Sequence, residues 1–174
     1  KADVARRALA AGATIINDVS ALRYDEAMID LVVESGCPVC VMHMQGMPKT
    51  MQDDPRYEDV VDEVLRFLEE RLAFAFARGV REEQVMVDPG IGFGKTVAHN
   101  LALLDGLSRF ATLGRPVLLG TSRKRFLGAI VGAEPAERVI GTVATTVIGF
   151  LAGAHVFRVH DARPNFEALR VAVA

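Results

Sequence analysis

The sequence has 174 residues, of which 51% are hydrophobic and 24% are charged, a composition typical of one globular domain with a core of its own. The formal net charge of −2 argues against a basic nucleic-acid-binding surface and against a long acidic tail. Two cysteines and the lack of a secretory signal predict a reducing, cytoplasmic location. Because the chain starts at Lys1 and residues 2–9 already have a helical pattern, we expect it to begin inside a longer protein.

Five short runs rich in Val, Ile and Leu alternate with helical stretches along the rest of the chain. Apolar runs without clean alternation are typical of strands that are covered on both faces, as in parallel sheets. Gly36, Gly79 and Gly153 follow three of the helical stretches, in the position that often ends a helix. The predicted order after the first helix is strand 13–16, helix 25–35, strand 38–42, helix 57–78, strand 84–87, helix 101–111, strand 116–119, helix 135–152, strand 155–159 and helix 165–174.

This alternation predicts a parallel sheet, either open and doubly wound or closed as a (β/α)8 TIM barrel. Polar residues follow every predicted strand, namely Asn17, Asp18, His43, Asp88, residues 121–124, Arg158, His160 and Asp161. Polar groups at all the strand ends favour a barrel, in which these ends converge on one mouth, and a whole barrel has about 250 residues. The sequence therefore predicts an α/β fold in which residues 1–174 form the last five units of a (β/α)8 barrel.

The stretch 88–96, DPGIGFGKT, is similar to a phosphate-binding loop but departs from both nucleotide-binding patterns. The Walker pattern requires glycine where Pro89 stands, and the dinucleotide pattern requires glycine where Lys95 stands. A plain glycine turn leaves Asp88 unexplained, because a carboxylate at the end of a buried strand is costly without a partner.

Cys37 and Cys40 have the spacing of redox and zinc sites. They lead into a strand rather than a helix, and no second such pair completes a zinc site. We interpret them as ordinary core cysteines.

Residues 139–157 contain no Asp, Glu, Lys or Arg, so a membrane span must be considered. Three threonines and three glycines interrupt this stretch, and its end has the pattern of a strand. We expect a buried helix that leads into a barrel strand, with part of the helix 135–152 forming a subunit interface.

Two basic segments follow the last two predicted strands. Residues 122–125 read Ser-Arg-Lys-Arg and precede an apolar helical stretch, while Arg158 and His160 lie two residues apart on one side of a strand end. Cations beside the N–H groups of a helix start bind anions. The sequence therefore predicts an anionic substrate at this mouth of the barrel.

Together these motifs resemble the dihydropteroate synthase family. The matching stretches lie in the family's order and near its spacings, at residues 16–19 (INDV), 41–46 (VMHMQG), 88–95 (DPGIGFGK), 122–124 (SRK) and 158–161 (RVHD). The resemblance covers almost the whole chain. It implies a cytoplasmic transferase of folate biosynthesis that condenses 6-hydroxymethyl-7,8-dihydropterin diphosphate with 4-aminobenzoate. It also implies Mg²⁺ as cofactor, a homodimer, and competition between sulfonamides and 4-aminobenzoate.

The resemblance implies a pterin pocket built from five residues. Asp88 would accept hydrogen bonds from the pterin N3–H and 2-amino group, and Asn17 would bind the ring through its amide. Lys124 would reach the O4 and N5 side of the ring. Met42 and Phe93 would line its apolar faces.

The resemblance also implies the residues that bind the other groups. Arg158 and His160 would hold the diphosphate and, with Lys124, would act in catalysis. Ser122 and Arg125 are candidates for the 4-aminobenzoate carboxylate, although many family members carry serine where this chain has Arg125.

Three further strand units precede the first strand in the resembled family, with an aspartate, an asparagine and two mobile loops that serve the site. We therefore assign no metal ligand to this chain and expect the 174-residue piece alone to be inactive. Two alternatives remain: a methyltetrahydrofolate:corrinoid methyltransferase-like barrel, or a non-catalytic pterin-binding paralogue. The basic segments 122–124 and 158–160 argue against the first alternative, and the intact set of site residues argues against the second.

Overall fold

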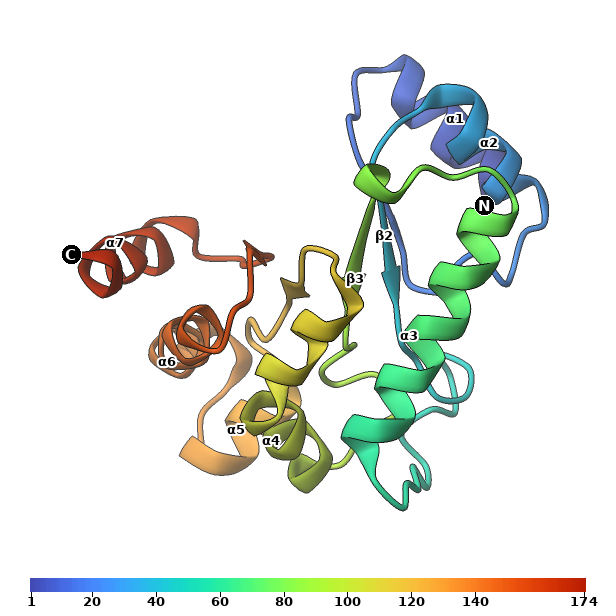
Figure 1. The fold of residues 1–174 in the computed structure, drawn as a ribbon. Coiled ribbons are helices and arrows are strands. Elements are labelled where there is room, and N and C mark those ends of the chain that lie inside the picture. Colours follow the sequence, from blue (N-terminus) through green and yellow to red (C-terminus); the bar gives the residue numbers. More distant parts are fainter.

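A computed structural model describes residues 1–174. It has seven α-helices and five strands (Figure 1). Strands and helices alternate as the sequence predicts, except that two helices rather than one separate the last two strands. In chain order the elements are α1 (Ala2–Ala10), β1 (Ile16–Asp18), α2 (Ala27–Ser35), β2 (Val39–Met42), α3 (Val60–Ala77), β3 (Val85–Asp88), α4 (Val97–Asp105), β4 (Leu118–Leu119), α5 (Arg125–Val131), α6 (Val139–Leu151), β5 (Val156–Phe157) and α7 (Ala162–Val173), with short 3-10 turns at Glu82–Gln84, Leu107–Leu113 and Pro135–Glu137.

The strands are parallel and their spatial order follows the chain. One sheet has the order β1-β2-β3, a second pairs β4 with β5, and a parallel bridge between Val87 and Val117 connects the two. Strand order that follows chain order is the order of a barrel rather than of a doubly wound sheet. The structure thus confirms the predicted architecture of consecutive β/α units.

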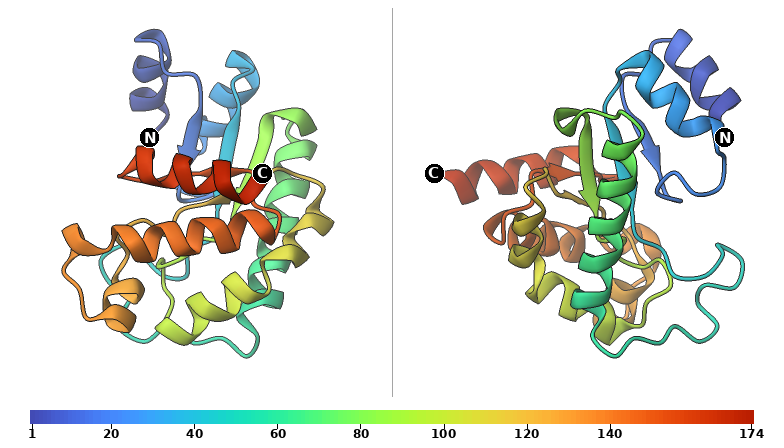
Figure 2. Two further views of the ribbon diagram at one scale, coloured as in Figure 1. Left: turned by 90° about the vertical axis from the view of Figure 1, so that its left-hand side faces the viewer. Right: turned by 45° about the vertical axis from the view of Figure 1, so that its right-hand side comes forward.

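The helices cover one side of this arc of strands, each beside its neighbour in the chain. Figures 1 and 2 show α1 against α2 at one end of the molecule and α6 against α7 at the other. A continuous core of 30 buried residues runs from Ala2 to Ala154. It includes Val39 and Val41 of β2 and Val85 and Val87 of β3, so this face of the sheet packs on the helices.

The first strand begins three residues later than the sequence predicts. The N–H groups of Gly12 and Ala13 still bond to carbonyls of α1, at 3.0 and 2.9 Å, so this segment ends the helix and cannot pair with β2. The expectation of strands covered on both faces holds for β2, whose four residues are all buried. It is wrong for β5, where neither residue is buried, because this strand lies at the edge of its sheet.

The helix expected at 101–111 is in fact two elements. Helix α4 begins at Val97 because the Thr96 side chain accepts a hydrogen bond from the His99 N–H (3.1 Å) and so caps the helix. Gly106 ends it, and a 3-10 turn continues the chain.

Helix α6 differs from the buried helix that its composition predicts. Ile140 and Leu151 are 80% and 72% exposed, whereas Thr142, Thr145 and Thr146 are buried. The threonine hydroxyls find partners inside, since Thr145 bonds to Thr121 (2.7 Å) and Thr146 to Asn165 (2.7 Å). The face of α6 that carries the threonines is therefore the buried one, because Thr121 and Asn165 provide hydrogen-bond partners for their hydroxyls. None of the helices combines the length and the apolar character that crossing a membrane requires.

Candidate active site

Strand register places three of the predicted pterin residues on one face of the sheet. Asn17 pairs with Cys40, and Met42 pairs with Asp88. Paired residues of neighbouring strands, and residues two apart on one strand, point to the same side. Asn17, Met42 and Asp88 therefore share the face opposite the helices, with Asn17 exposed and the other two buried.

The glycine-rich loop after β3 folds back over the end of β2. The Gly90 N–H donates to the Asp88 carboxylate at 2.7 Å, and the His43 N–H donates to the Asp88 carbonyl at 3.0 Å. The Asn100 side chain accepts a hydrogen bond from the Gly92 N–H at 2.6 Å. Gly90 has φ +71°, a conformation that glycine adopts at little cost. The loop is thus a rigid support for Asp88 rather than a nucleotide-binding turn.

Lys124 crosses to this loop from the end of β4. Its ammonium lies 4.6 Å from the centre of the Phe93 ring and donates to the Ile91 carbonyl. Burial lowers the pKa of Lys124 to about 8, and the nearby Asp88 carboxylate opposes that shift. The structure therefore brings Asp88, Phe93 and Lys124 together as the sequence predicts.

Asp88 is the buried carboxylate of the site, with 5% of its surface exposed. Burial raises its pKa above the ordinary value, and the cations of Lys124, Lys95 and Arg158 and the Gly90 N–H oppose the rise. A ligand that presents two N–H donors to this carboxylate would favour its ionised form in the same way.

Lys95 and His43 form a buried pair that the sequence reasoning missed. Lys95 is 3% exposed and donates to His43 Nδ1 at 2.8 Å and to the Phe93 carbonyl at 3.1 Å. Burial lowers the pKa of Lys95 to about 7 and that of His43 to about 2, so His43 is neutral and accepts through Nδ1. One feature of the sequence could have pointed to Lys95. It ends the glycine loop as Gly94-Lys95, and the loop matches neither nucleotide-binding pattern.

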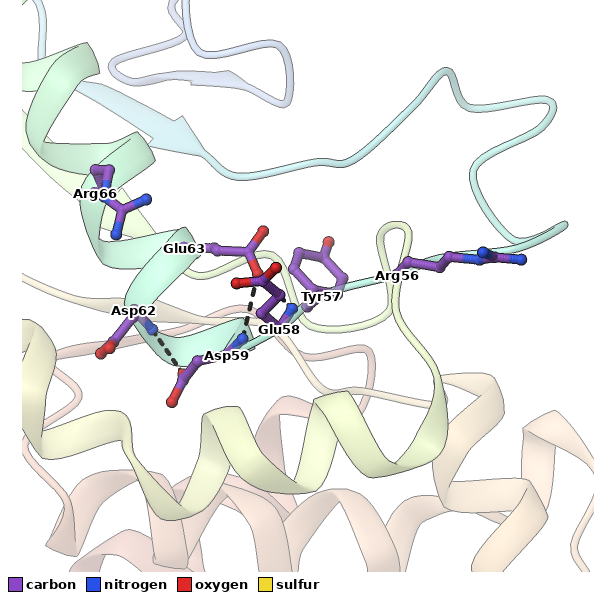
Figure 3. A pocket seen from close by; sticks show the side chains of 7 residues that line it. All are labelled: Arg56, Tyr57, Glu58, Asp59, Asp62, Glu63 and Arg66. Atoms are coloured by element: carbon purple, nitrogen blue, oxygen red, sulfur yellow. Dashed lines mark hydrogen bonds between the residues drawn. The ribbon is translucent and has the colours of Figure 1, made fainter.

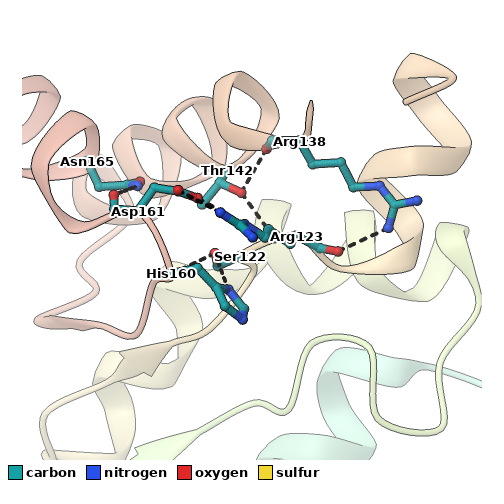
Figure 4. Close-up of polar contacts among 7 residues, drawn as sticks. All are labelled: Ser122, Arg123, Arg138, Thr142, His160, Asp161 and Asn165. Carbon is teal, nitrogen blue, oxygen red and sulfur yellow. Dashed lines mark hydrogen bonds and ion pairs between the residues drawn. The ribbon is translucent and has the colours of Figure 1, made fainter. Parts of the chain in front are cut away.

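Ser122 and His160 contact each other across the ends of β4 and β5. The Ser122 hydroxyl lies 2.8 Å from His160 Nδ1 and accepts a hydrogen bond from the His160 N–H at 3.0 Å (Figure 4). His160 is exposed, as is Arg158 two residues earlier. Arg158 and His160, the predicted diphosphate residues, are thus exposed at the ends of the strands, whereas Ser122 is buried.

Arg123, between Ser122 and Lys124, has a strained backbone with φ +56°. Its guanidinium forms a two-point ion pair with Asp161 at 2.7 and 3.1 Å. Its N–H donates to Thr142, and its carbonyl accepts from Arg138 at 3.0 Å (Figure 4). These contacts with three residues at the starts of α6 and α7 stabilise the backbone conformation between Ser122 and Lys124.

A cavity of about 480 Å³ opens beside Phe93 and Lys124, between the glycine loop and the start of α5. Arg125 begins that helix and lines the cavity. Ser122 does not line it, because its hydroxyl faces His160. The full lining is Met51, Gln52, Pro55, Gly92, Phe93, Lys95, Thr96, Val97, Asn100, Lys124, Arg125, Phe126 and Ala129.

Another hollow lies at the start of α3, away from the predicted residues (Figure 3). Its acidic groups serve the helix: Asp59 accepts from the N–H groups of Val61 and Asp62, and Glu63 accepts from the Glu58 N–H at 2.8 Å. Because these carboxylates cap α3, we interpret this hollow as structural.

The side chains that could ligate a metal are scattered over the molecule. No group of three or more His, Cys, Asp or Glu side chains is arranged to hold a metal ion. Cys40 is buried, Cys37 is partly buried, and both thiols are free, which confirms the interpretation of Cys40 as a core residue.

Comparisons with known proteins agree with this geometry. The family model described as "Pterin binding enzyme" matches residues 1–160. The dihydropteroate synthase of Escherichia coli K12 is 43% identical over 174 residues, which is all of this chain and 61% of that protein. The chain therefore spans about 61% of the length of the curated relatives that it matches.

Solved structures show the same likeness. A dihydropteroate synthase of Yersinia pestis with a sulfonamide drug complex superposes with a TM-score of 0.96 at 39% identity, covering 99% of this chain and 62% of that one. A dihydropteroate synthase of Xanthomonas albilineans in complex with 7,8-dihydropteroate has a TM-score of 0.91 at 45% identity, covering 98% and 62%.

Proposed function

The chain belongs to the pterin-binding enzyme family, and we propose that it is the part of a dihydropteroate synthase that binds the pterin and the diphosphate. The reaction joins 6-hydroxymethyl-7,8-dihydropterin diphosphate to 4-aminobenzoate and yields 7,8-dihydropteroate and diphosphate. The observation that carries the proposal is the buried Asp88, which shares a face with Asn17 and Met42 and lies beside Lys124.

Asp88 supplies the recognition of the pterin edge. An ionised carboxylate accepts two parallel N–H bonds, which suits the N3–H and 2-amino donors of a pterin. Asn17 completes the polar grip, Lys124 donates to the O4 and N5 side, and Met42 and Phe93 pack on the ring faces.

The chemistry breaks a C–O bond and forms a C–N bond at one methylene carbon. The diphosphate leaves with the C–O electron pair, and Arg158 and His160 stabilise the charge that develops on it. The amine of 4-aminobenzoate donates its lone pair to the methylene and then loses a proton to solvent. An aniline nitrogen is unprotonated near neutral pH, so no general base is required, and Arg125 at the start of α5 attracts the carboxylate of this substrate.

We assign the expected Mg²⁺ to the diphosphate of the substrate rather than to ligands of this chain. Magnesium prefers phosphate oxygens and water, and the side chains of this chain form no metal cluster. No step of the reaction is assigned to it.

We further propose a cytoplasmic homodimer that sulfonamides inhibit by competing with 4-aminobenzoate. The free thiols of Cys37 and Cys40 support a reducing compartment. The exposed apolar side chains of Ile140, Ile148 and Leu151 on α6 support an interface on that helix. Sedimentation of the complete protein tests this, and a strictly monomeric result would exclude the interface.

The direct test is a coupled assay of diphosphate release by the complete protein that contains this chain, together with calorimetric titration of a pterin diphosphate. Asp88→Ala removes two charge-assisted hydrogen bonds and should weaken pterin binding by about a hundred-fold or more. Asp105→Ala, an exposed carboxylate at the end of α4, is the matched control and should bind as the original protein does.

The assay also separates the remaining alternatives. Undiminished binding by Asp88→Ala would contradict the role given to Asp88. Pterin binding without diphosphate release would favour a methyltransferase-like barrel or a non-catalytic paralogue, because neither expels a diphosphate.

A further inference from the structure

The Ser122 hydroxyl contacts His160 at two atoms. The Ser122 hydroxyl oxygen accepts the His160 backbone N–H at 3.0 Å, and its second partner is His160 Nδ1 at 2.8 Å. The arrangement that uses both capacities of the hydroxyl has its oxygen accept the backbone N–H while its proton is donated to Nδ1.

A ring nitrogen that accepts a hydrogen bond forces the proton of a neutral imidazole onto the other nitrogen. In His160 the proton therefore lies on Nε2, which Figure 4 shows on the side of the ring away from Ser122. The exposed edge of His160 is thus an N–H donor, the type of group that a diphosphate oxygen accepts.

The position of the Ser122 hydroxyl is itself well determined. Ser122 is 7% exposed. On one side Thr121 bonds to Thr145 at 2.7 Å, and on the other Arg123 pairs with Asp161 at two points. Because both chain neighbours are anchored to other elements, Ser122 cannot move away from His160 without breaking these contacts.

We propose that Ser122 is a positioning residue that holds His160 as the Nε2–H tautomer, with that donor directed at the departing diphosphate. This inference rests on the proposed function for the identity of the acceptor. It gives Ser122 a role different from the 4-aminobenzoate contact expected from the sequence. As charge builds on the leaving oxygens, a donor already in place strengthens its hydrogen bond without reorganisation.

Nuclear magnetic resonance of the complete protein with ¹⁵N-labelled histidine tests the tautomer without any substrate. The chain has four histidines, and His160→Gln assigns the His160 ring signals by their disappearance. We expect neutral His160 to be the Nε2–H tautomer in the original protein and a mixture of both tautomers in Ser122→Ala. Ser35→Ala removes a hydroxyl that bonds to the Leu31 carbonyl in α2 and does not touch His160, so it should leave the tautomer unchanged.

Kinetics test the consequence for the reaction. Loss of one oriented hydrogen bond to a charged group should lower kcat about ten-fold in Ser122→Ala, while the Michaelis constant for the amine substrate changes little. Ser122→Thr, which keeps the hydroxyl, should restore both the tautomer and most of the rate.

Two results would overturn the proposal: an unchanged His160 tautomer in Ser122→Ala, or a changed tautomer with an unchanged kcat. Failure of the original protein to release diphosphate would instead contradict the proposed function. The tautomer would then still show whether Ser122 orients His160.

Discussion

Adding one methyl group at Gly90 should disrupt the site more than its size suggests. A Cβ built at Gly90 lies 2.9 Å from the His43 carbonyl carbon and closer still to its oxygen. Both partners are backbone atoms, so neither can rotate away. The Gly90 N–H is also a donor to the Asp88 carboxylate, so any displacement of the loop disturbs the pterin-binding group.

The expected cost of Gly90→Ala has two parts. Alanine at a positive φ costs about 1–2 kcal/mol, and forcing a methyl group into a packed contact costs about 1–3 kcal/mol more. The sum is about 2–5 kcal/mol, a large share of the stability of an ordinary domain. Gly114→Ala is the matched control, because Gly114 also has a positive φ (+63°) but has open space where a Cβ would lie.

Urea unfolding of the complete protein measures both variants, and calorimetry follows pterin binding. We expect Gly114→Ala to lose only the conformational part and to bind the pterin normally, while Gly90→Ala loses both stability and affinity. Equal losses of stability in the two variants would refute the steric reasoning, and normal binding by Gly90→Ala would refute the connection to Asp88.

Two further changes test the electrostatics around the mouth. Burial lowers the folded-state pKa of Lys95 to about 7 from an ordinary value of 10.5, so between these values the unfolded chain binds the extra proton and folding stability rises with pH. Lys95→Met should lack this rise in urea titrations from pH 7 to 10, and parallel curves for the two proteins would contradict the shift. Asp161→Asn breaks the two-point pair with Arg123 and should lower the stability only slightly while lowering kcat. An unchanged kcat would show that the Arg123–Asp161 pair does not support the active site.

Much of the fold follows from local pattern, and the exceptions have physical causes. Strand β2 and helices α2 and α3 lie within two or three residues of their predicted ends, because periodicity and glycine positions reflect local backbone preferences. The same reasoning did not predict which face of helix α6 is buried. Its apolar residues surround the helix, so the pattern defines no inner face, and the choice depends on Thr121 and Asn165 in distant segments.

The site divides in the same way. Polar residues at strand ends predicted that Asp88, Lys124 and Arg158 would meet, because parallel strands place their carboxyl ends at one edge. The pairing of Lys95 with His43 could not be predicted, because it depends on how the glycine loop folds back over β2. Ser122 was expected to face a substrate, and the structure turns its hydroxyl to His160 instead.

Between β4 and β5, side-chain hydrogen bonds take the place of missing backbone hydrogen bonds. These strands pair over only two residues each, too short a ladder to fix the mouth of a barrel by itself. Beyond its end, the Arg158 N–H still donates to the Leu119 carbonyl, and Ser122 then bonds to His160. The Arg123–Asp161 pair follows in the same direction. Side-chain bonds therefore continue the register where backbone pairing stops, so the residues that join the two strands also hold the segment of Arg158 and His160, which we propose bind the diphosphate.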